Sequence, residues 1–331
     1  MSMDTINAPQ YARNYGFWNE AEQQAIMDSS VAIAGVGGDG FALGQNLARM
    51  GVASFSVADP EVFEPENTNR VPGAVQDNYG RNKAEVFREE ILKINPDANV
   101  RVFTEGVTKD NIQDFMEGAT LSYDETELTH LDLGTMVARE ARRRKIPNVL
   151  IMNVGFAALA TSFHPESKHT FERMMGVPDD MPLEEVAGQP LDLSRCVPYL
   201  PKYLDINTLK AVQEGAPLPS IVQGVGIAAA MGATQGFLHM VNGIDKRREQ
   251  PTWAPKFAYM DTMGHVAAET RFARLSHTIT GLRMALRSKF GRNVPTSFSD
   301  EDRESRAAEY VAEHPEALNR RTPQRGNHAA I

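Results

Sequence analysis

A glycine-rich turn is the feature of this sequence best suited to chemistry. Gly35, Gly37, Gly38 and Gly40 lie in the run Gly-Val-Gly-Gly-Asp-Gly, directly after the apolar residues 31–34 and before a segment with helical spacing. Glycines let the backbone turn tightly and approach a phosphate, whose charge the free amides of a helix N-terminus stabilise. The run therefore predicts a nucleotide-binding loop, and a purely structural tight turn is the alternative.

Charged residues downstream indicate which kind of nucleotide the loop would bind. Asp59 ends the next apolar run, the position of a ribose-hydroxyl acceptor. Arg70 and Lys83 follow, and an ordinary dehydrogenase has no need of two cations there. An enzyme that expels pyrophosphate does, because both cations offset the charge that develops on the leaving group. We expect both side chains to face solvent until nucleotide binds, and simple surface cations are the alternative.

The elements that position these residues follow from periodicity. Apolar runs at 31–35, 54–58, 99–103, 121–123 and 148–153 predict strands, and helical spacing at 19–27, 41–50, 83–94 and 134–144 predicts helices. A β–turn–α–β unit of this kind implies a parallel sheet covered by helices. The sequence thus predicts an α/β, Rossmann-like, doubly wound and mainly parallel fold.

The remainder of the chain divides by composition. Residues 164–219 hold eight of the 19 prolines, which indicates a long crossover segment with short helices. Residues 220–241 predict a buried helix and 256–266 a late strand. We therefore expect a helical lead-in (1–29), an ATP-binding domain (30–163), the crossover, the rest of the same domain (220–291) and a polar, disordered tail (292–331).

Composition excludes several classes of protein. The chain has 331 residues and a net charge of −9, so it is a poor candidate for binding nucleic acid or an anionic membrane through bulk charge. Its single cysteine, Cys196, excludes an internal disulfide and a multi-cysteine zinc site. The polar N-terminus has no apolar signal core, and glycines and polar residues interrupt the 220–241 run. We expect a soluble, cytoplasmic protein.

The sequence resembles the ThiF/MoeB/HesA family, bacterial relatives of ubiquitin-activating enzymes. The motifs that carry this resemblance are Tyr-Ala-Arg-Asn around Arg13, the glycine loop, the stretch 59–70, Gly-Arg-Asn-Lys ending at Lys83, and Lys-Ile-Asn-Pro at 93–96. The likeness covers roughly residues 10–160 well and is weaker at 220–243. It implies a homodimer that uses ATP and Mg²⁺ to adenylate the C-terminal carboxylate of a ubiquitin-like protein, a sulfur-carrier protein or a peptide.

The resemblance also assigns roles to individual residues. Asp59 and Glu61 would lie at the nucleotide, with Asp59 on the ribose, and Asn67, Arg70 and Lys83 would contact the phosphates. Arg13 would reach across the dimer into the partner's site, so Arg13, Arg70 and Lys83 are the candidate catalytic residues. The apolar, small-residue helix at 220–241 is able to pack closely against another surface, which also favours a dimer.

Three departures from the family pattern matter. The Asp-x-x-Asp pattern that handles magnesium reads Asp124-Glu-Thr-Glu127 here, so Glu127 is the candidate metal ligand and Asp124 the second choice. The paired Cys-x-x-Cys motifs are absent, which excludes that zinc site. Cys196 lies in the crossover segment, where family members keep an acyl-accepting cysteine; packing is the alternative role.

Three functions remain open at this point. An ATP-dependent adenylyltransferase explains the two cations, whereas an NAD(P)-dependent oxidoreductase on the same fold leaves them unexplained. A non-catalytic nucleotide-binding scaffold is the third, and Glu127 and the missing zinc motifs mildly support it. The fate of an acyl-adenylate (sulfur transfer, ester or amide formation, or dehydration) cannot be chosen from the sequence.

Overall fold

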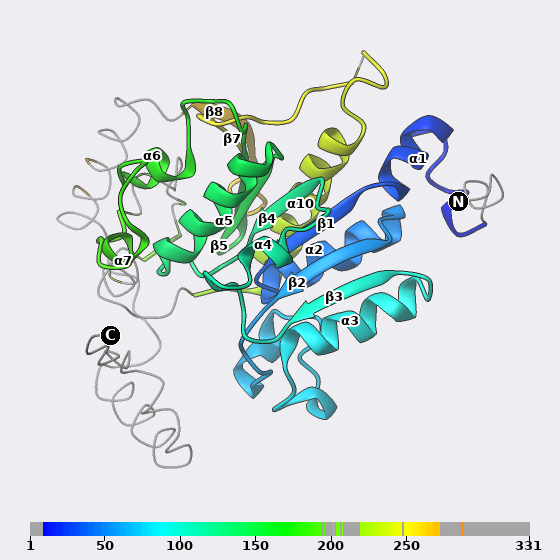
Figure 1. Cartoon of the computed structure of the whole chain (residues 1–331), viewed down its shortest axis with the longest axis horizontal. Coiled ribbons are helices and arrows are strands. Elements are labelled where there is room, and N and C mark those ends of the chain that lie inside the picture. Colours follow the sequence, from blue (N-terminus) through cyan, green and yellow to red (C-terminus); the bar gives the residue numbers. More distant parts are fainter. Residues whose placement is uncertain are drawn as a thin grey trace. The chain divides into compact units, whose positions relative to one another are not determined.

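An eight-stranded sheet organises the protein (Figure 1). The structure is a computed structural model, and it describes residues 9–192, 195, 201, 203–205, 207, 219–246, 248–271, 282 and 286. The strand order is β3-β2-β1-β4-β5-β6-β7-β8, with β3, β2, β1, β4 and β5 parallel and the later pairs antiparallel. The strands are β1 (Ser30–Ala34), β2 (Ser54–Ala58), β3 (Asn99–Phe103), β4 (Leu121–Asp124), β5 (Asn148–Val154), β6 (Ala157–Phe163), β7 (Lys256–Asp261) and β8 (Val266–Arg271).

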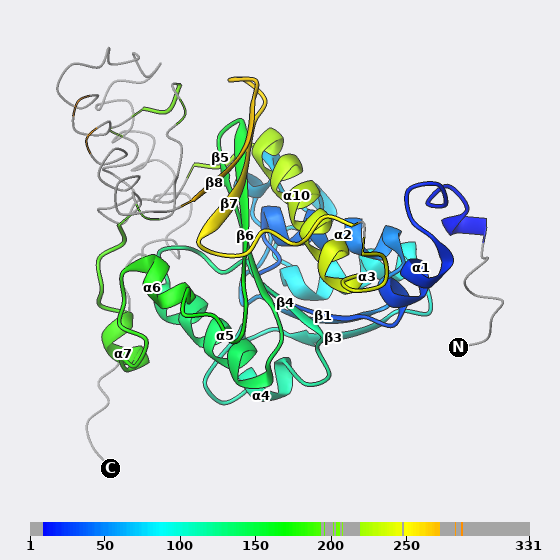
Figure 2. The same ribbon diagram turned by 90° about the horizontal axis from the view of Figure 1, so that it is seen from above.

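Helices cover both faces of the parallel strands (Figure 2). One face carries α2 (Gly38–Met50), α3 (Lys83–Ile94) and α10 (Val222–Met240), and the other carries α4 (Ile112–Phe115) and α5 (Leu131–Arg144). The shorter helices are α1 (Glu20–Met27), α6 (Phe171–Met175), α7 (Leu183–Val186), and the 3₁₀ turns η2 (Pro9–Tyr11), η3 (Pro65–Asn69) and η4 (Gln76–Asn78). This doubly wound arrangement confirms the fold expected from the sequence.

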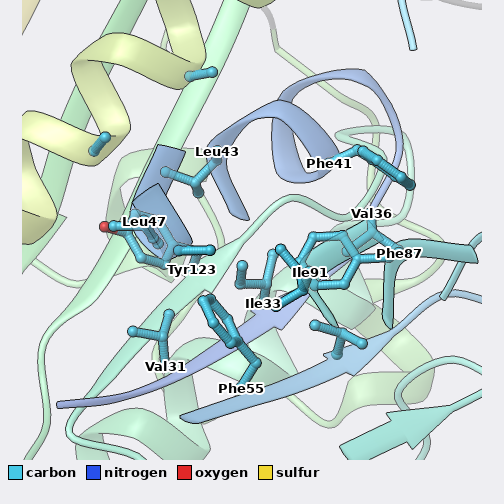
Figure 3. Packing of buried hydrophobic residues seen from close by; sticks show 14 of the residues in the cluster. Val31, Ile33, Val36, Phe41, Leu43, Leu47, Phe55, Phe87, Ile91 and Tyr123 are labelled. Carbon is cyan, nitrogen blue, oxygen red and sulfur yellow. The ribbon is translucent and has the colours of Figure 1, made fainter. Parts of the chain in front are cut away.

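The largest apolar core lies between the sheet and the α2–α3–α10 layer (Figure 3). Its aromatic centre is formed by Phe41, Phe55 and Phe87, whose rings pack edge to face at centroid distances of 5.3 and 6.2 Å. Gly44 leaves room for this centre, because a Cβ there would lie 2.2 Å from the Phe87 ring. The interdigitated core fixes α2, and therefore the loop that precedes it, against the carboxyl ends of β1 and β4.

The antiparallel half of the sheet differs from the sequence expectation. The strand β6 was not expected, and the expected single strand at 256–266 is a hairpin, β7–β8. Gly155 has φ +64° and makes the tight turn from β5 to β6 possible, and His265 has φ +53° in the β7–β8 turn. Carboxylate Oδ1 of Asp261 accepts hydrogen bonds from the amides of Met263 and Gly264, which closes the second turn.

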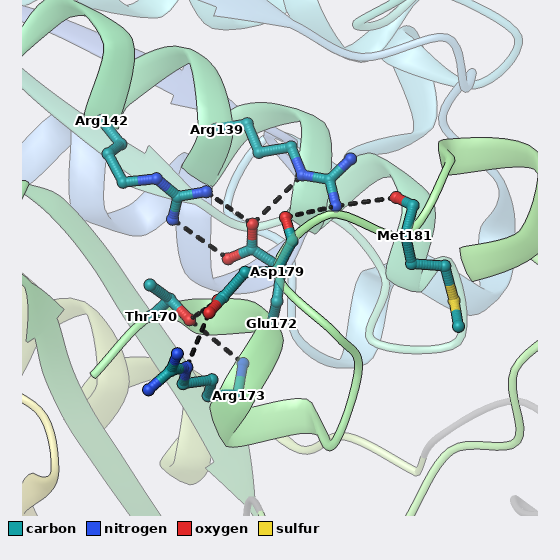
Figure 4. Close-up of polar contacts among 7 residues, drawn as sticks. All are labelled: Arg139, Arg142, Thr170, Glu172, Arg173, Asp179 and Met181. Atoms are coloured by element: carbon teal, nitrogen blue, oxygen red, sulfur yellow. Dashed lines mark hydrogen bonds and ion pairs between the residues drawn. The ribbon is translucent and has the colours of Figure 1, made fainter. Parts of the chain in front are cut away.

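The first part of the crossover segment is fixed to α5 by a buried carboxylate (Figure 4). Glu172 on α6 is fully buried and accepts from Arg139 Nε at 3.1 Å and from Arg142 Nη2 at 2.7 Å. Arg139 Nη2 also donates to the carbonyl of Met181 at 2.8 Å. Glu172 thus ties α6 to α5, and Arg139 ties α5 to the turn before α7. Within the described residues no helix is long and apolar enough to cross a bilayer.

Candidate functional site

The glycine loop is held in a conformation that only glycine allows. Gly35 has φ +94°, and a Cβ there would lie 2.2 Å from the carbonyl oxygen of Glu125. Gly40 is equally constrained, because its Cβ would lie 2.1 Å from the carbonyl oxygen of Gly35. The amide of Gly35 donates to the carbonyl of Ala58 at 2.8 Å, which joins the loop to β2. The loop is therefore rigid before any ligand binds.

The N-terminus of α2 is open to an anion. Gly37 is the N-cap and makes no side-chain capping bond. Among the described residues, the amides at positions 37–40 donate to no protein acceptor, whereas the amide of Phe41 donates to the carbonyl of Gly37. Nothing lies within 4 Å of a Cβ placed on Gly37. Free amides, open space and the positive end of the helix dipole together suit a phosphate.

Asp59 lies beside this loop at the end of β2. Its carboxylate is buried and accepts from the amide of Val36 in the loop and from the amide of Glu61, each at 2.9 Å. Burial raises the pKa of Asp59, and the nearby Lys83 ammonium opposes that rise. The two accepted bonds leave lone pairs on both oxygens, so a ribose hydroxyl could still donate to this carboxylate.

Lys83 is buried, so the expectation of a solvent-facing side chain was wrong for this residue. It begins α3, its side chain is only 6% exposed, and its ammonium is ion-paired with Glu61, which is 58% exposed. Asn82 fixes the start of α3 by accepting from the amides of Ala84 and Glu85. The α3 N-terminus therefore places a buried, ion-paired cation next to Asp59.

Arg70 is held differently, directly after η3. Its guanidinium is half-buried, and Nη1 donates to the carbonyl of Glu66 at 3.1 Å and to Oδ1 of Asn69 at 2.9 Å. Its Cγ lies 3.8 Å from a Cβ placed on Gly38, so the side chain borders the loop. Asn67 is buried and its Oδ1 accepts from the amide of Glu64, which caps η3. Asn67 thus shapes the turn that carries Arg70.

The two candidate metal ligands have different surroundings. Asp124 is buried at the end of β4, and its Oδ1 accepts from both the amide and the hydroxyl of Thr126. Burial raises the pKa of Asp124 to about 6. Glu127 is exposed, with Oε2 accepting from Thr129 at 3.4 Å. Across the described residues no group of three acidic, histidine or cysteine side chains could hold a metal by itself.

Three polar residues near the loop were missed by the sequence reasoning. Asp39, the second residue of α2, accepts from Asn153 Nδ2 on both carboxylate oxygens, at 3.0 and 2.9 Å. Burial raises the pKa of Asp39 to about 7, while Asn153 and Arg70 oppose the rise. Glu125 has a buried oxygen, Oε1, without a described partner, and burial together with Asp39 and Asp124 raises its pKa. The sequence signal that could have found this group was Asp39 itself, an acidic residue inside a loop whose amides suit a phosphate.

The two remaining candidates, Arg13 and Cys196, are not part of this cluster as the structure describes it. Arg13 is exposed after η2 and makes no ion pair or hydrogen bond with the described residues. Cys196 lies outside the described residues, so its role stays a prediction.

The small residues of α10 serve the molecule's own core. A Cβ on Gly232 would lie 3.0 Å from Ile151, and one on Gly236 would lie 2.1 Å from the hydroxyl of Tyr123. The opposite side of α10 faces a groove of about 780 Å³ between this helix and the β7–β8 hairpin. Most of its lining is apolar, including Ile227 and Met231. This outer face, rather than the glycines, is the surface that remains for a partner.

The curated relatives that follow each match less than half of the chain. The tRNA threonylcarbamoyladenosine dehydratase of Escherichia coli is 34% identical over 144 residues, which are 44% of this chain and 52% of that protein. The SUMO-activating enzyme subunit 1 of Mus musculus is 36% identical over 31% of this chain and 29% of its own length. The matched part thus spans about half or less of these relatives.

Solved structures and a family model cover more of the chain. The E. coli MccB structure with ATP has a TM-score of 0.61 at 17% identity, and the alignment covers 81% of this chain and 73% of MccB. The PaaA structure has a TM-score of 0.58 at 16% identity, covering 82% and 74%. These likenesses show the fold alone. The model of the ThiF family matches residues 11–278, and the chain therefore belongs to the ThiF family.

Proposed function

We propose that this protein is an ATP-dependent adenylyltransferase. One observation carries the proposal: an open helix N-terminus in the glycine loop is flanked by the buried cation Lys83 and the half-buried cation Arg70. A dinucleotide-binding oxidoreductase has no use for both. The related proteins whose names include SUMO-activating and SAMP-activating enzymes support the same class of chemistry.

The proposed reaction is the attack of a carboxylate on the α-phosphate of ATP. A bond forms between a carboxylate oxygen and the α-phosphorus, the bond to the bridging oxygen breaks, and pyrophosphate leaves with its electron pair. The amides at 37–40 would bind phosphate oxygens, Asp59 the ribose, and Lys83 and Arg70 the leaving pyrophosphate. These groups lower the barrier by positioning and by stabilising charge.

Magnesium would enter this site together with the nucleotide. Mg²⁺ in nucleotide sites is usually held by one or two carboxylates plus phosphate oxygens and water. The exposed Glu127 fits that role, whereas Oδ1 of Asp124 already accepts from Thr126, so Asp124 would hold the turn that presents Glu127. The bound metal would supply further charge neutralisation on the phosphates.

The identity of the carboxylate substrate rests on the family. The substrate we propose is the C-terminal carboxylate of a ubiquitin-like protein, a sulfur-carrier protein or a peptide. The tRNA-modifying relatives make a tRNA-linked carboxylate the rival substrate. The net charge of −9 gives bulk attraction to tRNA no support.

We also propose that the active form is a homodimer in the cytoplasm. The exposed Arg13 has no described partner, and the apolar groove along α10 offers a surface that a second copy could cover. Light scattering of the wild type should give twice the chain mass. Met231→Glu, which places a charge in the groove, should give the mass of one chain, and Glu269→Gln at the groove's polar margin is the control. A wild-type monomer at micromolar concentration would refute the homodimer.

The decisive test of the reaction is pyrophosphate exchange into ATP, with candidate carrier proteins, peptides and tRNA as separate additions. Arg70→Ala and Lys83→Ala should abolish exchange. Arg81→Ala and Lys93→Ala are controls, because these cations belong to the same segment but pair with Glu89 and Glu90 on the surface of α3. Calorimetric titration should show ATP–Mg²⁺ binding more tightly than NAD. Tighter binding of NAD would refute the proposal.

A further inference from the structure

Asp39 places a carboxylate where the proposed site needs a phosphate. It is the second residue of α2, inside the glycine loop and next to the free amides at 37–40. A helix N-terminus attracts any nearby anion, including a side chain from its own first turn. An unrestrained Asp39 would therefore compete with the nucleotide for the same amides and would repel its charge.

Asp39 nevertheless does not cap the helix. Both of its carboxylate oxygens accept from Nδ2 of Asn153, at 3.0 and 2.9 Å. Asn153 is the second-last residue of β5. It lies at the end of the sheet where the parallel strands terminate. The side chain of Asn153 thus holds the carboxylate against β5, and the amides of α2 remain unoccupied.

Asn153 is itself fixed in place. Its Oδ1 accepts from the hydroxyl of Ser220 at 3.0 Å, which sets the amide group so that Nδ2 points at Asp39. Its Cβ packs beside Gly224, where an added Cβ would lie only 3.0 Å away. The carbonyl of Ser220 in turn accepts from Nδ2 of Asn69, whose Oδ1 accepts from Arg70. A continuous chain of hydrogen bonds therefore runs from the glycine loop to Arg70, the residue that follows η3.

We propose that Asn153 is a positioning residue for the nucleotide: it restrains Asp39 so that the amides at the start of α2 stay available to phosphate. This inference rests on the proposed ATP site. It predicts that the effect of Asn153 on nucleotide affinity passes through Asp39. A residue with a merely structural role would affect affinity equally whether or not position 39 carries a charge.

A double-mutant cycle tests this coupling. ATP–Mg²⁺ dissociation constants are measured by calorimetry for the wild type, Asn153→Ala, Asp39→Asn and the double variant. We expect Asn153→Ala to weaken binding at least about tenfold, because Asp39 is freed to reach the amides. In the Asp39→Asn background the same change should cost less than about threefold, since a neutral amide competes poorly with phosphate.

Two further variants control the experiment. Ser220→Ala removes only the hydroxyl that orients Asn153, so it should weaken ATP binding less than Asn153→Ala does. Asn153→Leu keeps the volume of the side chain and replaces Asn153→Ala if that variant unfolds, as judged by its urea midpoint. Equal losses in the two backgrounds, or wild-type affinity in Asn153→Ala, would overturn the inference while the ATP site stands. No ATP binding by the wild type would overturn the proposed function and this inference together.

Discussion

The pair Gly40→Ala and Gly37→Ala separates what the glycine loop does for folding from what it does for a ligand. Replacing glycine by alanine inside a helix normally stabilises a protein by about 1 kcal/mol, because alanine loses less backbone entropy. At Gly40, the third residue of α2, the added methyl would lie 2.1 Å from the carbonyl oxygen of Gly35. That contact is far too short to persist.

Neither side of that contact can yield easily. The obstructing atom belongs to the backbone, and the amide of Gly35 is bonded to β2 through Ala58. Gly35 also lies directly under the carbonyl of Glu125, where a Cβ would be 2.2 Å away. The loop would have to move as a unit and lose these contacts. We expect Gly40→Ala to lower the free energy of unfolding by about 2–4 kcal/mol, as overpacking against backbone does.

Gly37→Ala should show the opposite combination. Gly37 has φ −70°, which suits alanine, but its ψ of −144° lies outside the main regions of an L residue, and its Cβ would meet nothing within 4 Å. Its stability cost should be about 1–2 kcal/mol, from this backbone strain and the poor N-cap preference of alanine, and smaller than that of Gly40→Ala. The methyl would, however, fill the open space above the free amides. We therefore expect ATP affinity to fall at least about tenfold in a well-folded protein.

Urea unfolding without nucleotide and calorimetric ATP titration measure the two effects separately. The slopes of the unfolding curves should match, so that the midpoints report stability. Gly226→Ala, on the groove side of α10 with nothing within 4 Å of its Cβ, is the control for a harmless helical substitution. Equal stability of Gly40→Ala and Gly37→Ala would refute the clash argument. Unchanged ATP affinity in Gly37→Ala would refute the assignment of the phosphate site.

Three further predictions concern charge. ATP affinity should fall as pH rises through 7, because burial raises the pKa of Asp39 to about 7 and bound phosphates favour its protonated form. The Arg70 guanidinium opposes the rise of this pKa, and the nearby Glu125 carboxyl adds to it. Calorimetry on Asp39→Asn should show a flatter dependence of ATP affinity on pH. Glu172→Ala should lower the free energy of unfolding in urea by about 2–3 kcal/mol, less than a fully buried pair would, since its two arginine partners are 26% and 31% exposed and regain water. Arg248→Met should destabilise the protein at neutral pH, because it leaves the buried Glu22 carboxylate unpaired; Arg248 lowers the pKa of Glu22, so the difference between variant and wild type should shrink in thermal melts as the pH falls and this acid is protonated.

Much of the parallel half of the fold could be predicted because its signals are local. The helix expected at 83–94 is α3 with the same bounds, and the strands expected at 54–58 and 99–103 are β2 and β3. The helix expected at 134–144 begins three residues earlier in the structure, at Leu131. In each case an apolar period and a capping residue such as Asn82 or Asn95 act within a few residues of one another.

The antiparallel half could not be predicted in the same way. The residues of β6, Ala-Ala-Leu-Ala-Thr-Ser-Phe, are all buried, so no alternation of polar and apolar residues marks them as a strand. The turn before it is a two-residue loop, Gly155-Phe156, in which a single glycine supplies the positive φ, and one glycine before a phenylalanine is a weaker sequence signal than Asn-Gly or Asp-Gly. The β7–β8 turn depends on Asp261 accepting backbone amides two and three residues later, which spacing alone does not reveal.

The candidate site shows the same division between local and tertiary information. The glycine loop, Asp59 and the two cations could be selected from residue type and spacing, and the structure places them around one helix N-terminus. The burial of Lys83 could not, because it results from the packing of α3 against β2 and from the pairing with Glu61. The contact between Asp39 and Asn153 joins residues 114 positions apart, which only the sheet brings together.

These differences give Lys83 and Arg70 separate tasks in the proposed reaction. Lys83 is largely desolvated and is held in place by its ion pair with Glu61, so a phosphate that arrives would share the ammonium with that exposed carboxylate or displace it. Arg70 keeps partial contact with solvent and two replaceable acceptors, the carbonyl of Glu66 and the amide oxygen of Asn69. It must exchange these for phosphate oxygens, and that exchange would release Asn69, which is bonded to Ser220 at the end of the crossover segment. The more exposed cation is thus the one that connects the nucleotide to the rest of the chain, and the buried one lies in a fixed place beside Asp59.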